Sequence, residues 1–225
     1  MPSPALIRRD PPGSTRGIVL MLHGGAKTGL DPVTGRSLSL RRTTAMRDVL
    51  TPHVLSEGFS VWLLRFGVRG WNADPHAGSV SGPGTGAREP SPVPDARWAL
   101  DQIAEAQPGV PVVLLGHSMG ARTAVHVADH KSVAGVVALA PWLERTDPVR
   151  MLAGRHLIAG HGRRDRITSA AMTRAFVDQA RNIAAFAKYV DLGQTGHYML
   201  RRAGDWNRFA LRSALTVFDR VAALE

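Results

Sequence analysis

One serine of this sequence stands in a setting that would make it a nucleophile. Ser118 is the centre of Gly116-His117-Ser118-Met119-Gly120, which follows the apolar run 112–115 and precedes a helical pattern. A serine on a sharp turn between a strand and a helix is exposed, and glycines two positions away let the chain pass closely. The N–H groups at the start of the helix favour negative charge beside the hydroxyl. The motif therefore predicts acyl transfer at Ser118.

A serine hydroxyl needs a neighbouring base, which a third group orients. The sequence offers His197, in the glycine-containing loop after the last predicted strand, and Asp165, in the loop after the strand before it. We expect both residues at the carboxyl edge of the sheet, where they could meet Ser118. Glu144 and Asp147, which follow the preceding strand, are alternative acids. Asp191 lies too early in its strand to reach comfortably.

The oxyanion of an acyl-transfer intermediate needs N–H donors. The backbone N–H of Met119, directly after the nucleophile, is one candidate. The turn His23-Gly24-Gly25-Ala26 follows the first core strand and offers the second, with Gly25 preferred and Ala26 as the alternative. We interpret His23 as a side chain that packs against this turn and hydrogen-bonds to it.

Arginines at the same edge of the sheet, Arg65, Arg69 and Arg122, could bind a carboxylate or phosphate of the substrate in a bidentate manner. The other interpretation is that they anchor loops through salt bridges. Three apolar residues are expected to be exposed and to line either the pocket or a dimer contact: Trp71, Trp142 and Met199.

The remaining histidines do not indicate a metal site. His161 lies in a glycine-rich loop near the same edge, and we interpret it as a packing or loop residue. No two histidines pair with carboxylates at the helical spacing of metal motifs, and the chain contains no cysteine. We therefore expect neither a metal nor a cofactor.

The elements that position these residues alternate between apolar runs of strand length and helical patterns, which is typical of a mostly parallel sheet covered on both faces. The expected strands are 17–22, 59–64, 110–115, 133–139, 156–159 and 185–190. The expected helices are 40–55, 96–106, 119–128, 170–183 and 205–223. Asp95 is a candidate N-cap, and Gly58 a candidate helix stop.

The chain has 225 residues, of which 44% are hydrophobic, and this predicts a single domain over residues 1–225. Residues 67–94 hold six glycines and five prolines, and we expect this long loop to lie over the active-site edge as a partial lid. The N-terminus lacks the apolar core of a signal peptide, and no stretch has the length of a membrane span, so the expected compartment is the cytoplasm.

The formal net charge of +10 has two interpretations. It could mark a surface for nucleic acid or anionic lipid, or it could reflect arginines scattered over the surface. The basic pairs are spread along the chain without a nucleic-acid-binding motif, so we expect no nucleic-acid or membrane partner. Monomer and homodimer stay equally open.

Together, the HGG turn, the serine motif, the Ala140-Pro141-Trp142 step, residues 160–165 and Gly196-His197 resemble the serine α/β-hydrolase superfamily, in particular a small, lidless bacterial esterase. The order Ser118, Asp165, His197 matches as well. The resemblance implies the α/β-hydrolase fold, a mostly parallel sheet of about six to eight strands, a catalytic triad and an acyl-enzyme. Related epoxide hydrolases and haloalkane dehalogenases carry aspartate in place of Ser118 and are disfavoured.

Two departures from the family pattern affect these expectations. Only about sixteen residues precede the first core strand, so the usual N-terminal hairpin strands should be missing or rudimentary. About fifteen residues separate Pro141 from His156, where many relatives insert a cap domain, so we expect no cap and an open site.

The sequence thus favours an ester hydrolase of the carboxylesterase, lipase or thioesterase kind, acting on a small or exposed acyl substrate. The alternative is a non-catalytic protein of the same fold that binds a ligand or partner.

Overall fold

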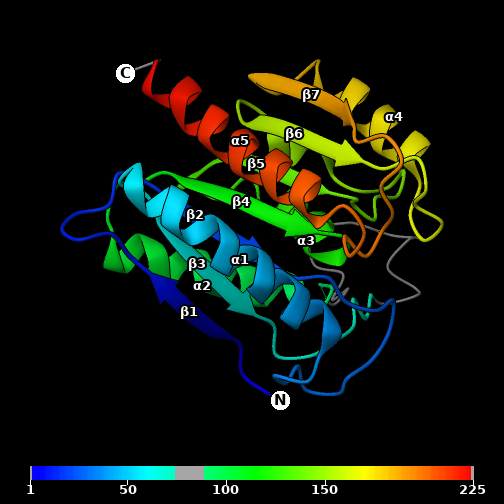
Figure 1. The fold of residues 1–225 in the computed structure, drawn as a ribbon, viewed down its shortest axis with the longest axis horizontal. Coiled ribbons are helices and arrows are strands. Elements are labelled where there is room, and N and C mark those ends of the chain that lie inside the picture. Colours follow the sequence, from blue (N-terminus) through cyan, green and yellow to red (C-terminus); the bar gives the residue numbers. More distant parts are fainter. Residues whose placement is uncertain (1, 74–88, 224–225) are drawn as a thin grey trace, which may run out of the picture.

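A seven-stranded sheet forms the centre of the molecule, and this computed structural model describes residues 2–73 and 89–223 (Figure 1). The strands are β1 (Ala5–Arg9), β2 (Ile18–Leu22), β3 (Ser60–Arg65), β4 (Val112–His117), β5 (Val133–Leu139), β6 (His156–His161) and β7 (Phe186–Asp191). All six predicted strands are present, each within two residues of its expected bounds, and the number of strands falls in the expected range of six to eight.

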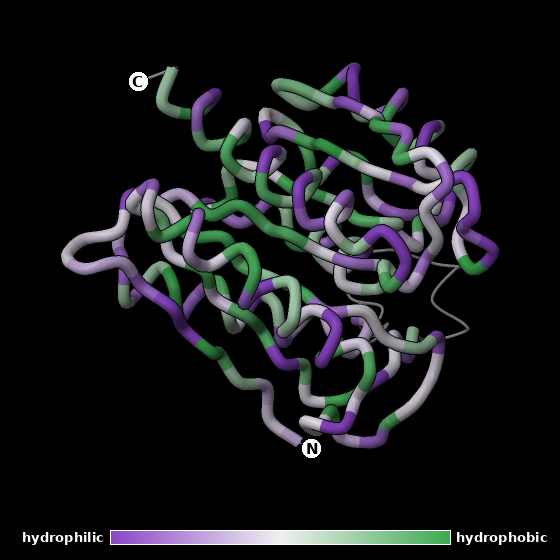
Figure 2. The backbone as a smooth tube through the Cα atoms, in the orientation of Figure 1, coloured by the Kyte–Doolittle hydropathy of each residue, from purple (hydrophilic) through white to green (hydrophobic). Residues whose placement is uncertain are grey.

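The strands follow the order β1-β3-β2-β4-β5-β6-β7, and every pair except β1 with β3 is parallel. The inner strands β2, β3 and β4 are buried along almost their whole length, as continuous apolar runs predict, and they appear green in Figure 2. Parallel pairing brings the carboxyl ends of six strands to one edge, on the right of Figure 1, where the loops carrying the predicted site residues begin.

Helices cover both faces of the sheet, as expected (Figure 1). α1 and α5 contact each other and pack on one face, whereas α2, α3 and α4 pack on the other. Their bounds are α1 (Leu38–Ser56), α2 (Pro92–Ala106), α3 (Met119–His126), α4 (Ala170–Ala180) and α5 (Ala203–Ala222). Gly58 follows the end of α1 with φ +76° and donates its N–H to the carbonyl of Leu55, which confirms the predicted helix stop.

The N-terminal segment contributes a strand that the sequence did not predict. β1 pairs antiparallel with β3, with Leu6 opposite Leu64. Its residues are only half-buried or exposed, so the apolar signal is weak. The guanidinium of Arg8 lies 4.2 Å from the ring centre of Trp62 on β3. One short strand thus covers the edge of β3.

The long loop predicted over 67–94 is shorter at its end than expected, because α2 begins at Pro92. Prolines are compatible with the first turn of a helix, where no intrahelical partner for their nitrogen is needed. Asp95 is therefore not the N-cap. It lies in the first turn, and its carboxylate accepts a hydrogen bond of 2.8 Å from the N–H of Gly67. Residues 74–88, on which the predicted lid depends, lie outside the described residues.

Between β5 and β6 the chain forms only the short 3-10 helix η1 (Val149–Leu152). This agrees with the expectation that no cap domain is inserted there. None of the described helices combines the length and apolar character needed to cross a membrane.

Candidate active site

Ser118 is the single residue between the end of β4 and the start of α3. Its backbone has φ +53° and ψ −115°, a conformation that is strained for a residue with a side chain. The flanking glycines make the turn sterically possible. A Cβ atom on Gly116 would lie 2.5 Å from the Cα of Ala121, and one on Gly120 would overlap the carbonyl oxygen of Leu22.

Hydrogen bonds connect Ser118, His197 and Asp165 in series. The Oγ of Ser118 lies 3.1 Å from the Nε2 of His197, and the Nδ1 of His197 lies 2.8 Å from the Oδ2 of Asp165. Ser118 and His197 are each 7% exposed. The loops after β4, β6 and β7 thus bring together the three residues that the sequence predicts as nucleophile, acid and base.

Asp165 is held in its charged form by a full set of donors. Burial opposes its charge, but hydrogen bonds from His161, His197 and the backbone N–H groups of Thr168 and Ile167 outweigh this effect and lower the pKa of Asp165 well below its usual range. The two N–H groups donate to Oδ1, whereas the imidazoles contact Oδ2. The carboxylate is therefore ionised and fixed in orientation at neutral pH.

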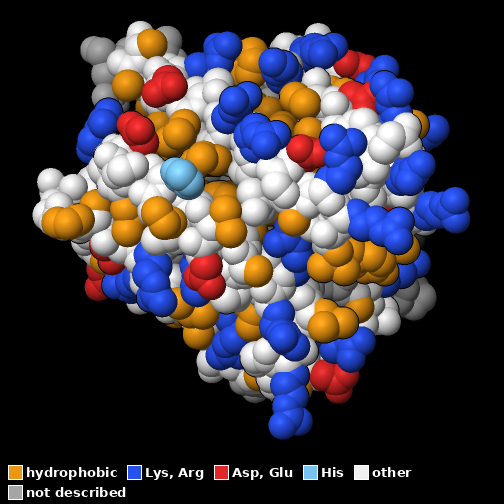
Figure 3. Space-filling view, in the orientation of Figure 1, with side chains coloured by type: hydrophobic (Ala, Val, Ile, Leu, Met, Phe, Trp, Pro, Cys, Tyr) orange, Lys and Arg blue, Asp and Glu red, His pale blue; other side chains and the backbone are white. Residues whose placement is uncertain are grey.

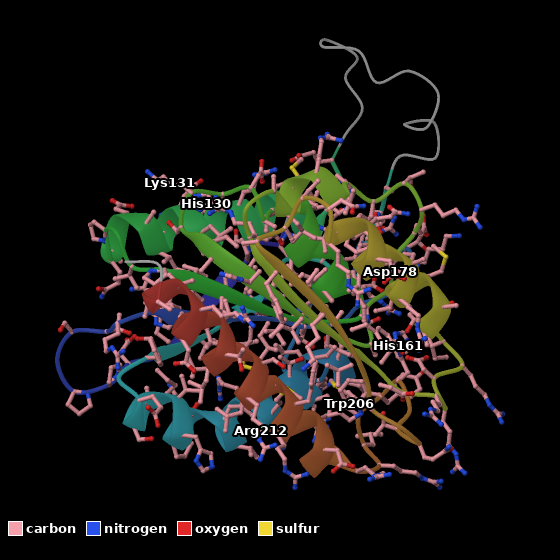
Figure 4. The ribbon with its side chains drawn as sticks, turned by 90° about the horizontal axis from the view of Figure 1, so that it is seen from above. His130, Lys131, His161, Asp178, Trp206 and Arg212 are labelled. Carbon is pink, nitrogen blue, oxygen red and sulfur yellow. The ribbon has the colours of Figure 1, made fainter. Side chains whose placement is uncertain are left out.

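His161 also contacts this carboxylate, at the same oxygen as His197, a role that the sequence analysis missed. Its Nε2 lies 3.1 Å from Asp165 Oδ2, and its Nδ1 lies 2.8 Å from the Oγ1 of Thr173 on α4. His161 ends β6 and is completely buried; Figure 4 labels it among the side chains of the interior. A histidine at a strand end, four residues before the predicted acid, is the signal that could have identified it.

His117, inside the serine motif, also supports the site. Its Nε2 lies 3.0 Å from the carbonyl oxygen of His197. Burial and the neighbouring His197 lower the pKa of His117 to about 3, so the ring is neutral at neutral pH and Nε2–H is the donor. The residue next to the nucleophile thus anchors the backbone of the residue that carries the base.

The loops that carry Asp165 and His197 are hydrogen-bonded to each other. Beyond the strands, Arg163 N–H donates to the carbonyl of Gly193 at 2.7 Å, and Arg164 N–H donates to that of Thr195 at 3.1 Å. A side chain on Gly162 would overlap Thr195. The pairing of β6 with β7 therefore continues into the loops and sets the distance between acid and base.

The side chain of Met119 lies against Gly25, the other residue predicted to supply an oxyanion donor. A Cβ on Gly25 would lie 2.5 Å from the Sδ of Met119. Within the described part of the chain, the N–H groups of Gly25 and Met119 donate to no acceptor. Ala26 is excluded as the alternative donor, because its N–H is bonded to the carbonyl of Arg69 at 2.9 Å.

His23 has the packing role expected of it. Its Nδ1 lies 2.7 Å from the carbonyl oxygen of Gly24, and its Nε2 accepts the N–H of Phe66. Burial lowers its pKa to about 4, which keeps the ring neutral. His23 thereby ties the turn that carries Gly25 to the end of β3.

The arginines suggested for substrate binding have structural partners. Arg65 donates to the carbonyls of Val33 and Ser3, so it anchors loops. Arg69 pairs with Asp31 at 3.1 Å and lines an open cleft of about 550 Å³ together with Gly25. Arg65 therefore fits the loop-anchoring interpretation, while Arg69 is at the rim of the site.

Arg122 follows the nucleophile on α3, and its side chain is buried against two tryptophan rings. Its guanidinium lies 4.4 Å from the ring centre of Trp71 and 4.7 Å from that of Trp142, and its Nε donates to Asp147 at 2.8 Å. This arrangement corrects the expectation that Trp71 is exposed, because it is 3% exposed; Met199, at 1%, is likewise buried.

The alternative acids form ion pairs with residues other than His197. Asp147 contacts Arg122 and His126, and Glu144 lies 3.1 Å from Arg122. Asp191 pairs with Arg163. Of the four acids considered from the sequence, Asp165 contacts His197.

Sequence comparison matches part of this chain to a known family. A family model described as serine aminopeptidase, S33, matches residues 65–160, a segment that includes Ser118 and ends before Asp165 and His197. No curated protein matches the sequence significantly.

Solved structures match over nearly the whole chain. An α/β serine hydrolase homologue from Coxiella burnetii is 17% identical, with 93% of this chain and 91% of that chain covered and a TM-score of 0.66. A serine hydrolase without a lid from Xanthomonas campestris is 18% identical, with 95% and 88% covered and a TM-score of 0.62. Est1E from Butyrivibrio proteoclasticus, solved with ferulic acid bound, is 11% identical, with 96% of both chains covered and a TM-score of 0.66.

These comparisons establish the fold. The chain has the α/β-hydrolase fold, and the resemblance to serine α/β-hydrolases that the sequence motifs indicate is confirmed at that level.

Proposed function

We propose that this chain is a serine hydrolase that cleaves a carboxylic ester or thioester of a small or exposed acyl substrate through an acyl-enzyme. The observation that carries the proposal is the continuous series Ser118 Oγ, His197 Nε2, His197 Nδ1 and Asp165 Oδ2, with contacts of 3.1 and 2.8 Å. A base in contact with the nucleophile and an acid in contact with the base are the arrangement that activates a serine.

In the proposed reaction, Ser118 Oγ forms a bond to the acyl carbon while its proton moves to Nε2 of His197. The carbonyl electron pair moves onto the oxygen, which the N–H groups of Met119 and Gly25 stabilise. When the carbonyl re-forms, the bond to the leaving oxygen or sulfur breaks, and that atom takes the proton from Nε2. Water then repeats the sequence, which releases the carboxylic acid and restores Ser118.

The ionised Asp165 has two roles in this reaction. It accepts the Nδ1–H of His197, which leaves Nε2 free to take the serine proton. It also stabilises the imidazolium that forms in the transition state. The low pKa of Asp165 supports this proposal, because the carboxylate stays charged throughout the neutral range.

The short connection between β5 and β6 supports an open site. In this segment the chain forms the four-residue η1 instead of a cap. A matched structure from Xanthomonas campestris is described as a serine hydrolase without a lid. We therefore expect small acyl groups, or acyl groups at the end of a larger molecule, to reach Ser118.

Labelling with a fluorophosphonate probe tests the proposal. Wild type, Ser118→Ala and His197→Ala are compared, and para-nitrophenyl esters of increasing acyl length are hydrolysed in parallel. We expect labelling and turnover in the wild type and neither in the two variants. Folded wild-type protein that neither reacts with the probe nor hydrolyses any ester would contradict the proposal and favour a non-catalytic binding protein.

A further inference from the structure

An open groove of about 630 Å³ begins at His197 and extends along the loops that follow β6 and β7. Three of its apolar side chains are unusually exposed: Ile167 at 60%, Tyr198 at 63% and Leu200 at 74%. Scattered exposed apolar residues are ordinary, but a cluster in a concave surface indicates a ligand. These three residues come from the two loops that the hydrogen bonds of Arg163 and Arg164 join.

The same groove is lined by three arginines, Arg164, Arg166 and Arg201. Arg164 and Arg201 each have an arginine neighbour that is ion-paired: Arg163 pairs with Asp191 at 2.8 Å, and Arg202 pairs with Asp205 at 2.6 Å. Within residues 2–73 and 89–223, ion pairs with carboxylates are found for these neighbours and not for the three groove arginines.

Two basic pairs, Arg163-Arg164 and Arg201-Arg202, therefore have the same arrangement. One arginine of each pair is held by a carboxylate, and the other lies on the groove, where Arg164 contacts the side-chain oxygen of Gln194 at 2.8 Å. On the right of Figure 3, hydrophobic side chains lie next to Lys and Arg side chains, on the side at which the parallel strands end. A ligand that fits this surface combines an apolar body with negative charge.

His197 determines which part of a substrate the groove receives. In the proposed reaction, Nε2 of His197 delivers a proton to the leaving oxygen or sulfur, so the leaving group lies beside the imidazole. The groove is lined by His197, whereas a separate cleft is lined by Gly25, the proposed oxyanion donor. The arginines therefore lie on the leaving-group side.

We propose that the groove binds the leaving group of the substrate, and that this alcohol or thiol has an apolar body with an anionic end such as a phosphate or sulfonate. The inference rests on the proposed hydrolase function and names its substrate class. Guanidinium groups suit phosphate and sulfonate oxygens because they offer several N–H donors in one plane.

Two matched pairs of esters test this inference. In the first pair the charge is on the leaving group: para-acetoxybenzenesulfonate is compared with the neutral para-acetoxybenzenesulfonamide. In the second pair the charge is on the acyl group: the para-nitrophenyl monoester of succinate is compared with para-nitrophenyl butyrate. Within each pair, kcat/KM for the charged ester is divided by that for the neutral one, in wild type and in Arg166→Ala/Arg201→Ala.

We expect the wild type to prefer the charged leaving group about tenfold or more at low salt, and the double variant to lose most of that preference. The preference should also fall as the ionic strength rises, because the arginines are exposed. Arg9→Ala is the control for net charge. Arg9 is exposed on β1, at the opposite edge of the sheet from β7, and its removal should leave the ratio unchanged.

Three outcomes would overturn the inference: no preference for the charged leaving group, a preference for the charged acyl group instead, or an equal loss of preference in Arg9→Ala. Failure of the proposed function is distinguishable, since a protein that is not a hydrolase would turn over neither the charged nor the neutral esters.

Discussion

His161 and His197 contact the same oxygen of one carboxylate. The Nε2 of His161 lies 3.1 Å from Asp165 Oδ2, and the Nδ1 of His197 lies 2.8 Å from it. The imidazole of His161 reaches no reacting atom, so His161 acts by holding Asp165 in place. Thr173 on α4 fixes the far side of its ring at 2.8 Å. The orientation of the proposed base therefore depends on a contact that runs through the acid to a helix behind the sheet.

The first prediction concerns His161 as a positioning residue. His161→Leu should lower kcat about tenfold and leave KM nearly unchanged, because it removes a hydrogen bond to a charged group without touching the substrate. His161→Gln can still donate to Asp165 and should retain more of the activity. His156→Gln, at the opposite end of β6, is the matched control for a buried histidine. Equal kinetics in His161→Leu and the wild type would exclude the positioning role.

The second prediction concerns the charge of Asp165. Its pKa is lowered in the folded protein, so its contribution to stability is complete above the ordinary aspartate pKa of about 4. That contribution is lost as the pH falls through the lowered pKa of the folded state. The difference in free energy of unfolding between wild type and Asp165→Asn should therefore be largest near neutral pH and shrink below about pH 4. Urea unfolding at several pH values measures it.

The same variant should lose most of its ester hydrolysis, on the order of 10³-fold or more in kcat, since an amide does not favour the required form of His197. Asp31→Asn, at an exposed residue, is the control for both measurements. A stability difference that stays constant down to pH 3 would show that the charge of Asp165 does not stabilise the fold.

The third prediction concerns the close contact between Gly25 and Met119. Gly25→Ala should lower kcat by about 10²-fold, because the added methyl group would lie 2.5 Å from the carbonyl of Arg69 and from the Sδ of Met119 and would displace a proposed oxyanion donor. Gly35→Ala meets no atom within 4 Å and should be neutral. Steady-state kinetics of both variants with one neutral ester decide this, and similar kcat values would contradict the assignment of Gly25.

The fourth prediction concerns the buried ion pair between Arg122 and Asp147. Asp147→Asn should lower the free energy of unfolding by about 2 to 3 kcal/mol, because it leaves the guanidinium of Arg122 buried with less compensating charge. Asp178→Asn breaks an exposed ion pair with Arg181 and should cost less than about 1 kcal/mol. Chemical denaturation compares the two, and equal losses would show that burial does not govern these pairs.

Much of the fold follows from the sequence, because the signal for each parallel strand is local. β5 has its predicted bounds, and Ser118 stands between a strand and a helix as its motif indicates. β1 was not predicted because a half-exposed edge strand has little apolar character. The start of α2 was misplaced because prolines that interrupt a helix elsewhere are accepted in its first turn.

The partners of the site residues were harder to predict, since they depend on contacts between distant segments. His117 lies 80 residues from the carbonyl it contacts, and nothing in the local pattern indicates that contact. The exposure of Trp71 was misjudged for the same reason, because Arg122 and Trp142 cover it only after folding. For the same reason, sequence spacing alone does not decide which of the candidate acids contacts His197.

The hydrogen bonds between the loops of Asp165 and His197 bear on how the site fluctuates. Since Arg163, Arg164 and Leu192 bond across the two loops, a local opening that frees one of these amides weakens the others, and the segments form one cooperative unit. Ser118 lies outside these loops, in the turn between β4 and α3, and contacts them through His197. We therefore expect that an opening of the paired loops moves Asp165 and His197 together relative to Ser118, so that acid and base keep their mutual alignment.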